Sequence, residues 1–482
     1  MRFIRNYPKI MIGMLITACI IPLFVPYPSA NAATGDVSCG PGCSRYDVVV
    51  IGSEIQGVLL AKSARDLGLN VVILDPRSKP GGELIQGQMM VLDEPNDKKK
   101  RSLVQGELKN LYAGYKAGSI RKQADFQRYF QKLIQGIPIR SGIVIQSLDI
   151  DSSDADKSIR SLSYKAKDGH NYTVQANYWV ENTDHNALTG KLGVKRIPGM
   201  ESIYNGKKPD YMAATFMLKL KKVNWNKLHL AILEDYPLTH VQTKYGPNSY
   251  VDWNFATGFS NITSNYKPLD SQLMLRGLNA TDQKNGEVII NSLLIFDVDP
   301  SNPKSVASAV TKARAEAPHV VQFLRKNIPG FAKAELNGYP DYLYIRDYNR
   351  YETDYVLTEQ DVMGSKMFWD NVSIGGYGMD LQGTRVMPKG NNVGTPDRYG
   401  LPLRSFELMS FENVIVVGNN VGATIKAYGS ARIVPNTALA AQSIGIILGR
   451  ESKHKRLKEL TAADFTRIHQ YLQKDYGIVL RK

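Results

Sequence analysis

The chain has 482 residues, of which 43% are hydrophobic and 22% are charged. This composition excludes a disordered, collagen-like or multi-span membrane protein, and the length suggests two or three folded units or one large unit with a second inserted into it. Sixty Lys and Arg residues against 45 Asp and Glu residues give a formal charge of +15, which favours anionic surroundings. Because the basic residues are spread along the chain without interleaved aromatic residues, we expect no nucleic-acid binding.

The first 32 residues have the features of a secretory signal peptide. Basic residues precede an apolar stretch over residues 10–25, and a small-residue cleavage pattern ends at Ala32. Cleavage there removes three positive charges and no acid, which leaves +12 on the mature chain. The alternatives are an uncleaved anchor and a lipoprotein cleavage at Cys19, but the apolar run is short for a membrane span and is broken by Pro22. We therefore expect a secreted or extracytoplasmic protein, at the cell surface or in the periplasm.

Two cysteines follow the signal peptide. Cys39 and Cys43 lie on a short segment, residues 33–45, ahead of the first predicted core strand. Outside the cytoplasm such a pair is expected to form a disulfide, and a redox-active pair is the alternative. One pair cannot supply the four ligands that most iron–sulfur clusters need, so we expect no cluster and no metal site.

Residues 46–75 have the order of a dinucleotide-binding βαβ unit. A β-branched run ends at Gly52, an apolar-periodic helix follows Gly57, and a second apolar run ends at Asp75, 18 residues past Gly57. The tight turn at Gly52 would direct the N-terminus of the helix at a pyrophosphate, and Asp75 would bind the ribose hydroxyls. Strand, helix and terminal acid together predict a bound dinucleotide.

The middle glycine of the G-x-G-x-x-G fingerprint is replaced here by Glu54, which follows Ser53. The backbone at this position must still approach the phosphate. A carboxylate would repel the pyrophosphate unless it turns outward or sits against a base. Glu54 is therefore either a tolerated departure or a sign of weakened binding.

Motifs beyond the βαβ unit indicate which dinucleotide is bound. Asp75 is followed by Pro76, a short loop and the pair Gly81 and Gly82, and a late apolar strand ends at Gly418. In these features the sequence resembles the FAD-dependent oxidoreductase family of the glutathione-reductase-like, GR2-type flavoprotein fold. The resemblance continues through residues 344–350, 354–362, 374–380 and 427–437.

This resemblance implies an α/β fold with a three-layer, Rossmann-like FAD-binding domain and FAD as the cofactor. Near the end of a further strand, Thr183 fits the segment that the family places beside the cofactor, although the glycine of that segment is missing. The residues expected to contact the cofactor are Gly52, Ser53, Glu54, Gly57, Asp75, Pro76, Gly81, Gly82, Thr183, Gly418, Asn419, Ser430 and Arg432.

From about residue 191 the pattern changes to separate alternating or apolar strands, which indicates a mainly antiparallel substrate lobe inserted into the nucleotide domain. The lobe also contains a helix over residues 305–326, interrupted at Pro318, and the tail contains a helix capped by Thr461. The expected divisions are a signal peptide over 1–32, a cysteine-bearing segment over 33–45, the first part of the FAD-binding domain over 46–190, the inserted lobe over 191–400, the second part of the FAD-binding domain over 401–450, and a C-terminal helical tail over 451–482.

The candidate catalytic residues are mainly arginines. Arg346 and Arg432 stand where the resembling family has characteristic arginines, and with Arg350 and Arg385 they could present guanidinium groups to a carboxylate, a hydroxyl-rich substrate or the edge of the flavin. Each arginine could instead pair with a neighbouring acid. Asn349 stands where the family often has another arginine, which argues against a multi-arginine clamp.

His185 is the third catalytic candidate, as a base, because it is the histidine in the segment beside the cofactor; a hydrogen-bonded structural role is the alternative. We expect an exported FAD-dependent oxidoreductase that transfers hydride between a small-molecule substrate and bound flavin. The alternative, indicated by Glu54, is a cell-surface flavin-fold binding protein with reduced or no catalysis. Given the positive charge, anionic cell-surface polymers are further candidate partners.

Overall fold

The structure, a computed structural model, describes residues 37–40 and 42–481. The predicted signal peptide and its cleavage site at Ala32 lie outside the described residues. Cys39 and Cys43 are joined by a disulfide, and this bond ties strand β1 (Val37–Gly40) to the first residue of β2 (Cys43–Ile51).

An eight-stranded sheet forms the centre of the predicted nucleotide-binding domain. β2 pairs in parallel with β3 (Val71–Asp75) on one side and with β7 (Asn171–Glu181) on the other. The parallel part is extended by β4 (Ile139–Ser141) and β21 (Val414–Val416). The remaining three strands pair in antiparallel fashion: β6 (Ser158–Lys165) pairs with β7, β5 (Val144–Asp151) pairs with β6, and β1 pairs with β2.

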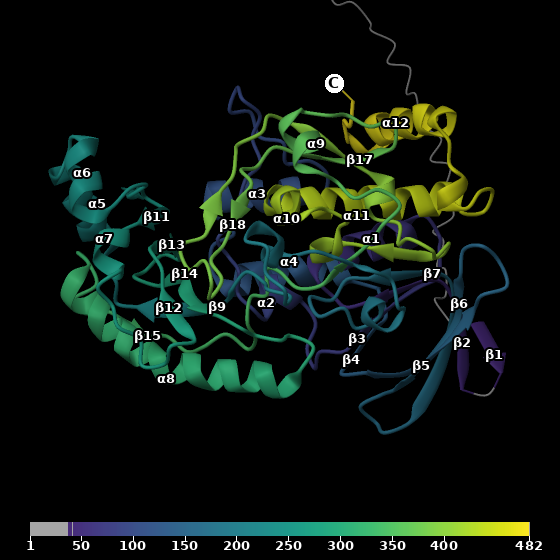
Figure 1. Cartoon of the computed structure of the whole chain (residues 1–482), viewed down its shortest axis with the longest axis horizontal. Helices are drawn as coiled ribbons and strands as arrows, with labels where there is room; N and C mark the ends of the chain where they lie inside the picture. The colour runs from purple at the N-terminus through teal and green to yellow at the C-terminus, as the bar shows by residue number, and fades with distance from the viewer. Residues whose placement is uncertain (1–36, 41, 482) are drawn as a thin grey trace, which may run out of the picture. The chain divides into compact units, whose positions relative to one another are not determined.

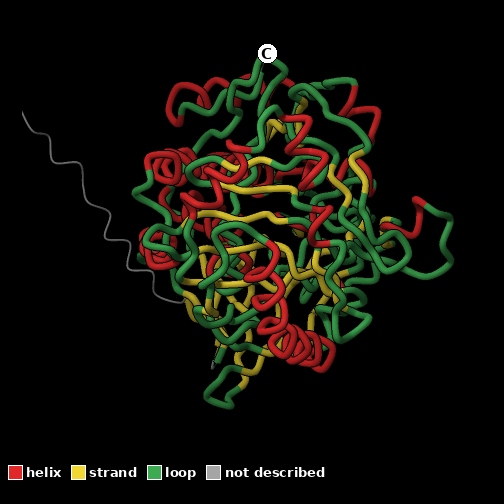
Figure 2. Tube along the Cα trace, turned by 90° about the vertical axis from the view of Figure 1, so that its left-hand side faces the viewer, coloured by secondary structure: helices red, strands yellow, loops and turns green. Residues whose placement is uncertain are grey.

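The apolar run of β2 is buried on both faces. Val48 and Val50 belong to the core that includes helices α1 (Ile55–Asp66) and α11 (Val434–Glu451). Val49 and Ile51 belong to a second core that also contains residues of β5 and β6. Figure 1 shows α1 and α11 side by side, and Figure 2 shows the strands running through the centre with helices around them. This burial explains why β2 reads as a continuous hydrophobic run rather than an alternating one.

A second sheet, entirely antiparallel, lies within the insertion (Figure 1, left). It has its own hydrophobic core, which includes residues of helix α8 (Pro303–Asn327). Its strands, in spatial order, are β10 (Tyr250–Val251), β11 (Phe255–Gly258), β13 (Leu278–Asp282), β14 (Val288–Ile295), β9 (Ala214–Lys221) and β15 (Glu335–Leu336), with β12 (Leu273–Leu275) also paired to β14.

The predicted interruption at Pro318 is wrong, because α8 continues through this residue. The helix buries Ala313, Ala317, Val320 and Leu324 in the core of the inserted sheet. Burial of this apolar face on both sides of the proline offsets the backbone hydrogen bond that proline cannot donate.

The range predicted for the inserted lobe, residues 191–400, contains the second sheet and also segments that pack into the main core. β15 is the last strand of the second sheet, and Leu343 and Ile345 after it still belong to the core of that sheet. Later in the chain, β17 (Asn371–Gly375) pairs with β20 (Tyr399–Pro402), and residues of both strands share the main core with α11.

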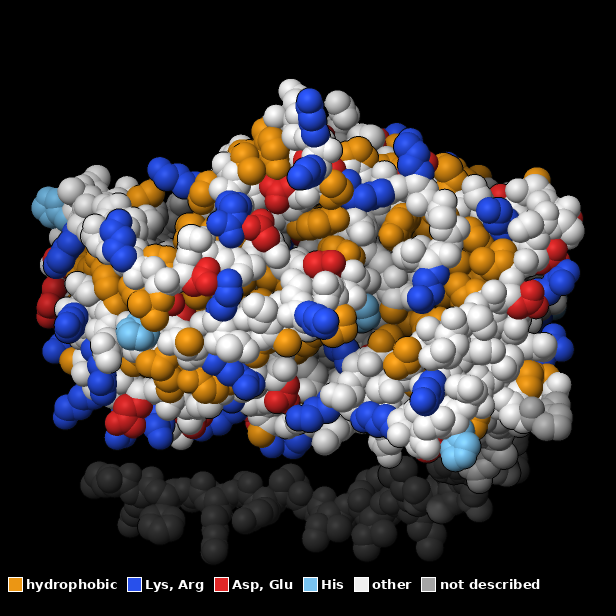
Figure 3. Space-filling model, turned by 60° about the horizontal axis from the view of Figure 1, so that its bottom comes forward, with side chains coloured by type: hydrophobic (Ala, Val, Ile, Leu, Met, Phe, Trp, Pro, Cys, Tyr) orange, Lys and Arg blue, Asp and Glu red, His pale blue; other side chains and the backbone are white. Residues whose placement is uncertain are grey.

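The C-terminal helix α12 (Ala462–Tyr476) begins with the capping box of Thr461 and Asp464 and packs into the main core through Phe465 and Leu472. Within the described part of the chain, no single helix is long and apolar enough to cross a membrane; α10 (Ile425–Ala431) and α11 pass that test only together, as a pair bent by 82°. Figure 3 shows lysines and arginines spread among acids over one face rather than gathered in a patch.

Candidate active site

The carboxyl ends of the parallel strands β2, β3, β7 and β21 meet at one edge of the first sheet, where α/β folds bind their ligands. Gly52 follows β2 with a φ of +96°, a left-handed conformation that favours glycine. A Cβ at Gly52 would lie 2.7 Å from the carbonyl oxygen of Asn182, which directly follows β7. The turn between β2 and α1 therefore packs directly on the end of β7.

Asn182 is a site residue that the sequence analysis missed. Its Oδ1 accepts a hydrogen bond from the backbone N–H of Gly57 at 2.7 Å. A Cβ at Gly57 or at Gly418 would lie within 3 Å of the Asn182 side chain. The glycines of the fingerprint and of the late strand thus let α1 and β21 approach one buried amide. The position of Asn182, one residue before Thr183 at the polar end of a predicted strand, was the signal that could have identified it as a site residue.

Asp75 is buried at the end of β3 and held by short polar contacts. The Ser53 hydroxyl donates to its carboxylate and accepts from the N–H of Gly81 at 2.9 Å. The backbone N–H of Arg77 donates to the same carboxylate at 2.8 Å. Burial raises the pKa of Asp75, while the Arg77 guanidinium and the Ser53 hydroxyl act in the opposite direction. Ser53, Asp75 and the glycine pair therefore form one connected loop structure.

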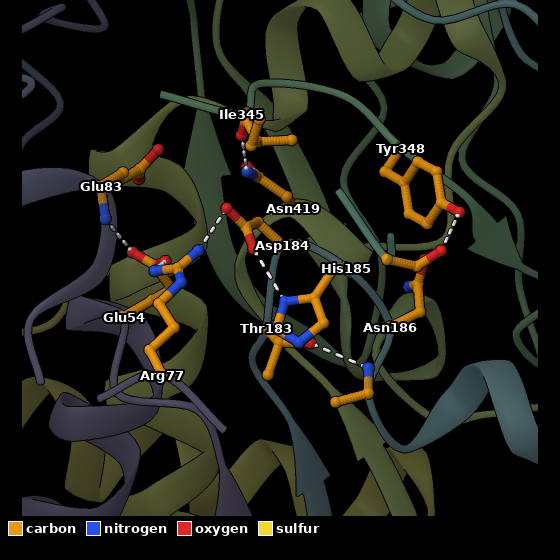
Figure 4. Close-up of polar contacts among 12 residues, drawn as sticks. Glu54, Arg77, Glu83, Thr183, Asp184, His185, Asn186, Ile345, Tyr348 and Asn419 are labelled. Carbon is orange, nitrogen blue, oxygen red and sulfur yellow. Dashed lines mark hydrogen bonds and ion pairs between the residues drawn. The ribbon is translucent and has the colours of Figure 1, made fainter. Parts of the chain in front are cut away.

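Glu54, the N-cap of α1, points inward and sits against a base (Figure 4). Its carboxylate lies 2.6 Å from Nη1 of Arg77 and accepts from the backbone N–H of Glu83 at 2.6 Å. The carboxylate also rests on Gly82, where a Cβ would clash with it. The sequence analysis allowed a carboxylate at this position if it turned outward or sat against a basic group. The structure shows the second arrangement, with Arg77 as the basic group.

The group around Arg77 contains more acids than bases. Arg77 pairs with Asp184 as well as with Glu54 (Figure 4). Burial raises the pKa of Glu54 and raises that of Glu83 to about 8, and the nearby carboxylates act in the same direction. For Asp184, Arg77 and the neighbouring histidine outweigh burial and hold the pKa below its usual range. Glu83 therefore keeps its proton at neutral pH.

His185 lies at the rim of this group. Its Nδ1 is 3.0 Å from the Asp184 carboxylate (Figure 4). It also lines a cavity of about 750 Å³, whose other walls include Pro76, Arg77 and Tyr342. The cavity lies beside the loop that follows Asp75, which places His185 with the predicted cofactor residues.

A second polar group forms where α10 and the segment after the inserted lobe meet. Arg432 follows α10, and its Nη2 lies 3.2 Å from the Asp380 carboxylate. Its Nη1 is 3.3 Å from the Tyr344 hydroxyl, and the guanidinium of Arg346 lies 4.7 Å from the centre of the Tyr344 ring. Arg346 itself donates to the carbonyl oxygen of Ala213 and to the Thr215 hydroxyl rather than to an acid.

A third arginine, Arg276, belongs to the same group and was not singled out from the sequence. Burial, together with the nearby charges of Arg276 and Arg432, lowers the pKa of Arg346 to about 10. We call Arg276, Arg346 and Arg432 the arginine cluster. The other two arginine candidates lie outside it, because Arg350 pairs with Asp347 and Arg385 pairs with Asp297 at the surface.

The remaining predicted residues connect these groups through hydrogen bonds within the protein. The side chain of Asn419 donates to the carbonyl oxygen of Ile345 at 3.0 Å (Figure 4). The Ser430 hydroxyl donates to the carbonyl oxygen of Tyr377 at 2.5 Å, and the Thr183 hydroxyl donates to the Glu181 carboxylate at 2.8 Å. These side chains fix the backbone of the site.

The sequence matches the family described as FAD dependent oxidoreductase over residues 47–471. The chain belongs to this family. No curated protein matches this FAD-dependent oxidoreductase in sequence.

Three of the solved structures that match this FAD-dependent oxidoreductase are distant from it in sequence. A geranylgeranyl bacteriochlorophyll reductase-like protein from Thermoplasma acidophilum has 10% identity and a TM-score of 0.41, covering 90% of this chain and 85% of that one. OxyS anhydrotetracycline hydroxylase from Streptomyces rimosus has 12% identity and a TM-score of 0.40, covering 90% and 68%. A flavoprotein/dehydrogenase from Cytophaga hutchinsonii has 9% identity and a TM-score of 0.36, covering 90% and 84%.

FAD is the cofactor of this FAD-dependent oxidoreductase, and unpaired polar atoms show that the site suits such a group. Buried polar atoms nearly always have hydrogen-bond partners. Three that have none are the Oε1 atoms of Gln56, Gln86 and Gln88. They lie on the first turn of α1 and just after helix α2 (Gly82–Ile85). The polar groups of a bound cofactor would supply the missing partners.

Proposed function

We propose that the protein is an exported FAD-dependent oxidoreductase that transfers hydride between a small organic substrate and bound FAD. The observation that carries this proposal is the arginine cluster, which joins a residue of the inserted sheet to residues beside the FAD-binding domain. When bound, FAD supplies the redox chemistry, while the chain supplies orientation and electrostatics.

In this proposal the ends of the parallel strands hold the cofactor. The N-terminus of α1, with Gly52 and Gly57, would receive the pyrophosphate, and Asp75 would bind the ribose hydroxyls. His185 lines the cavity beside this loop and is bonded to Asp184, so we assign it to the cofactor-holding group rather than to catalysis. The other residues that would line the cofactor are Ser53, Glu54, Pro76, Gly81, Gly82, Thr183, Gly418, Asn419 and Ser430.

Arg346 and Arg432 would act on the reacting groups. Both guanidinium groups are buried and held from fixed elements, Arg346 by Thr215 and Arg432 by Asp380. A positive charge held in a site of low polarity stabilises negative charge that develops during reaction more strongly than it would in water. We assign them this electrostatic role.

The signal-like features of residues 1–32 support the proposed export. The proposed hydride transfer is tested first. The visible spectrum of the purified protein should show bound oxidised flavin, and anaerobic addition of candidate hydride donors should bleach it. If FAD is bound and no donor of any class bleaches it, the chain is a flavin-fold binding protein and the proposed hydride transfer is wrong.

A further inference from the structure

The inserted sheet is irregular at Arg276. β12 and β13 both pair with β14, and the residues between them, Arg276 and Gly277, interrupt the ladder. On the other edge of β14 the register with β9 shifts between Ile290 and Leu293. Irregularities of this kind change the direction of a side chain and are frequent beside active sites.

The Arg276 side chain reaches toward the segment that contains Asp380 and Gln382, outside the inserted sheet. Its Nη1 donates to the Oε1 of Gln382, and Gln382 donates in turn to the Asp380 carboxylate at 2.6 Å. Asp380 is the acid that pairs with Arg432. Arg276 is therefore connected to Arg432 through two side chains, although it comes from the inserted sheet.

The arginine cluster contains more positive charge than its contacts neutralise. Arg276 donates its Nε and Nη2 to the carbonyl oxygen of Asn291, and Arg346 donates to a carbonyl and a hydroxyl. Among the described residues, neither Arg276 nor Arg346 forms an ion pair. Two acids lie close to the three guanidinium groups: Asp380, which pairs with Arg432, and Asp93, which also accepts from the Tyr377 hydroxyl at 2.9 Å. Three buried guanidinium groups facing two carboxylates leave one positive charge in excess, which is unfavourable unless an anion completes the site.

The arginine cluster also contains buried polar atoms that lack hydrogen-bond partners. Nε of Arg432 and Oδ1 of Asn291 are buried and have no hydrogen-bond partner. The Asn291 side chain stands on the shifted part of β14, next to the carbonyl oxygen that Arg276 binds. The unpaired guanidinium N–H points to a ligand acceptor at the cluster.

Building on the proposed function, we propose that the arginine cluster binds a carboxylate of the substrate, and that Arg276 determines this specificity. Guanidinium groups bind carboxylates through two parallel hydrogen bonds and keep their charge when buried. Arg276 comes from the inserted sheet and not from the strand ends that would hold the pyrophosphate and ribose. The substrate class is therefore a small organic acid rather than a neutral alcohol or sugar.

The test is a titration of the FAD-loaded, oxidised protein with sodium benzoate, pyruvate and succinate, followed through the flavin absorbance. Neutral benzamide is the matched control compound. We expect at least one carboxylate to shift the spectrum saturably and benzamide to leave it unchanged. Arg276→Gln should weaken that binding tenfold or more at unchanged FAD content.

Three further variants and measurements make the result decisive. Arg276→Lys keeps the charge, so it should fold even if Arg276→Gln melts early, and it should bind the carboxylate more weakly than wild type because the planar fork is lost. Arg385→Gln, an exposed arginine after the inserted lobe, should bind like wild type. The flavin midpoint potential of each variant shows which negative group the cluster serves. A lowered potential at unchanged carboxylate binding indicates the reduced flavin, whereas weakened carboxylate binding indicates the substrate.

The inference is overturned if FAD is retained and no carboxylate shifts the spectrum, or if Arg276→Gln and Arg385→Gln weaken binding equally. It is also overturned if Arg276→Gln and Arg276→Lys leave carboxylate binding unchanged and lower only the midpoint potential, because the cluster then serves the flavin. A protein whose flavin no donor reduces contradicts the proposed function, but the titration still decides the carboxylate site.

Discussion

Replacing Glu83 by glutamine tests the electrostatics of the group around Arg77. Glu83 lies in the first turn of α2, only 5% exposed, and its backbone N–H donates to the Glu54 carboxylate. Burial, with the nearby charges of Glu54 and Asp184, raises the pKa of Glu83 from the usual 4.5 to about 8. The glutamine side chain has almost the same shape but cannot release a proton.

A carboxyl that holds its proton more tightly in the folded state makes stability fall as the pH rises. Between pH 4.5 and 8 the folded protein retains the Glu83 proton while the unfolded chain has lost it. The free energy of unfolding then decreases by up to about 1.4 kcal/mol per pH unit, or about 4 kcal/mol from pH 5 to pH 8. Stability from this group is fully present below pH 4.5 and lost by pH 8, and Glu83→Gln removes the dependence.

Urea unfolding of the flavin-free protein at pH 5, 6, 7 and 8 measures this difference. We expect wild type to lose about 4 kcal/mol more than Glu83→Gln across the range. Glu234→Gln, an exposed substitution on helix α5 (Trp225–Glu234), serves as the control and should follow wild type. Parallel pH profiles for wild type and Glu83→Gln would refute the raised pKa and the proton held beside Glu54.

Three more outcomes are expected. Asp75→Ala should weaken FAD by about 1.5 to 3 kcal/mol, the loss of hydrogen bonds to a charged group, and an unchanged affinity in a flavin fluorescence titration would show that Asp75 holds no ribose. Glu54→Gly frees the Glu83 N–H and removes a buried carboxylate, so FAD should bind about tenfold more tightly; weaker binding would show that Arg77 needs Glu54. Mass analysis of exported protein should find Ala33 as the first residue, whereas an intact Met1 or a lipidated Cys19 contradicts cleavage there.

The βαβ unit could be predicted because its signals are local. A buried strand, a glycine with positive φ and a terminal acid all occur within 30 residues, and the structure places Gly52 and Asp75 at adjacent strand ends. The inward position of Glu54 could not be predicted, because it depends on Arg77 and on the backbone of Glu83, which the loop after β3 brings back to α1. Local patterns specify elements, while the contacts between loops are set by the tertiary fold.

Arg276 shows more clearly which site residues local sequence patterns cannot predict. In sequence it is a single charge in an apolar strand, a pattern that usually means an exposed residue on a half-buried strand. Its position in the cluster follows from the break between β12 and β13 and from contacts with Gln382, which lies far along the chain. Arg346 and Arg432 were found through the family resemblance rather than through periodicity, and Arg385, chosen by the same chemistry, pairs at the surface instead.

Substitution of Arg346 and Arg432 by lysine decides whether these residues serve turnover or folding. Lysine keeps the charge but loses the planar fork that reaches Thr215 from Arg346. A role in reaction predicts near-normal flavin content and melting temperature, with flavin reduction slowed tenfold or more, about 1.4 kcal/mol of transition-state stabilisation. Arg350→Lys, a buried arginine paired with Asp347 outside the cluster, should show the opposite result, lower stability with normal reduction per bound flavin. If the cluster variants behave like Arg350→Lys, these arginines are structural, and the reacting groups must come from other residues of the inserted sheet.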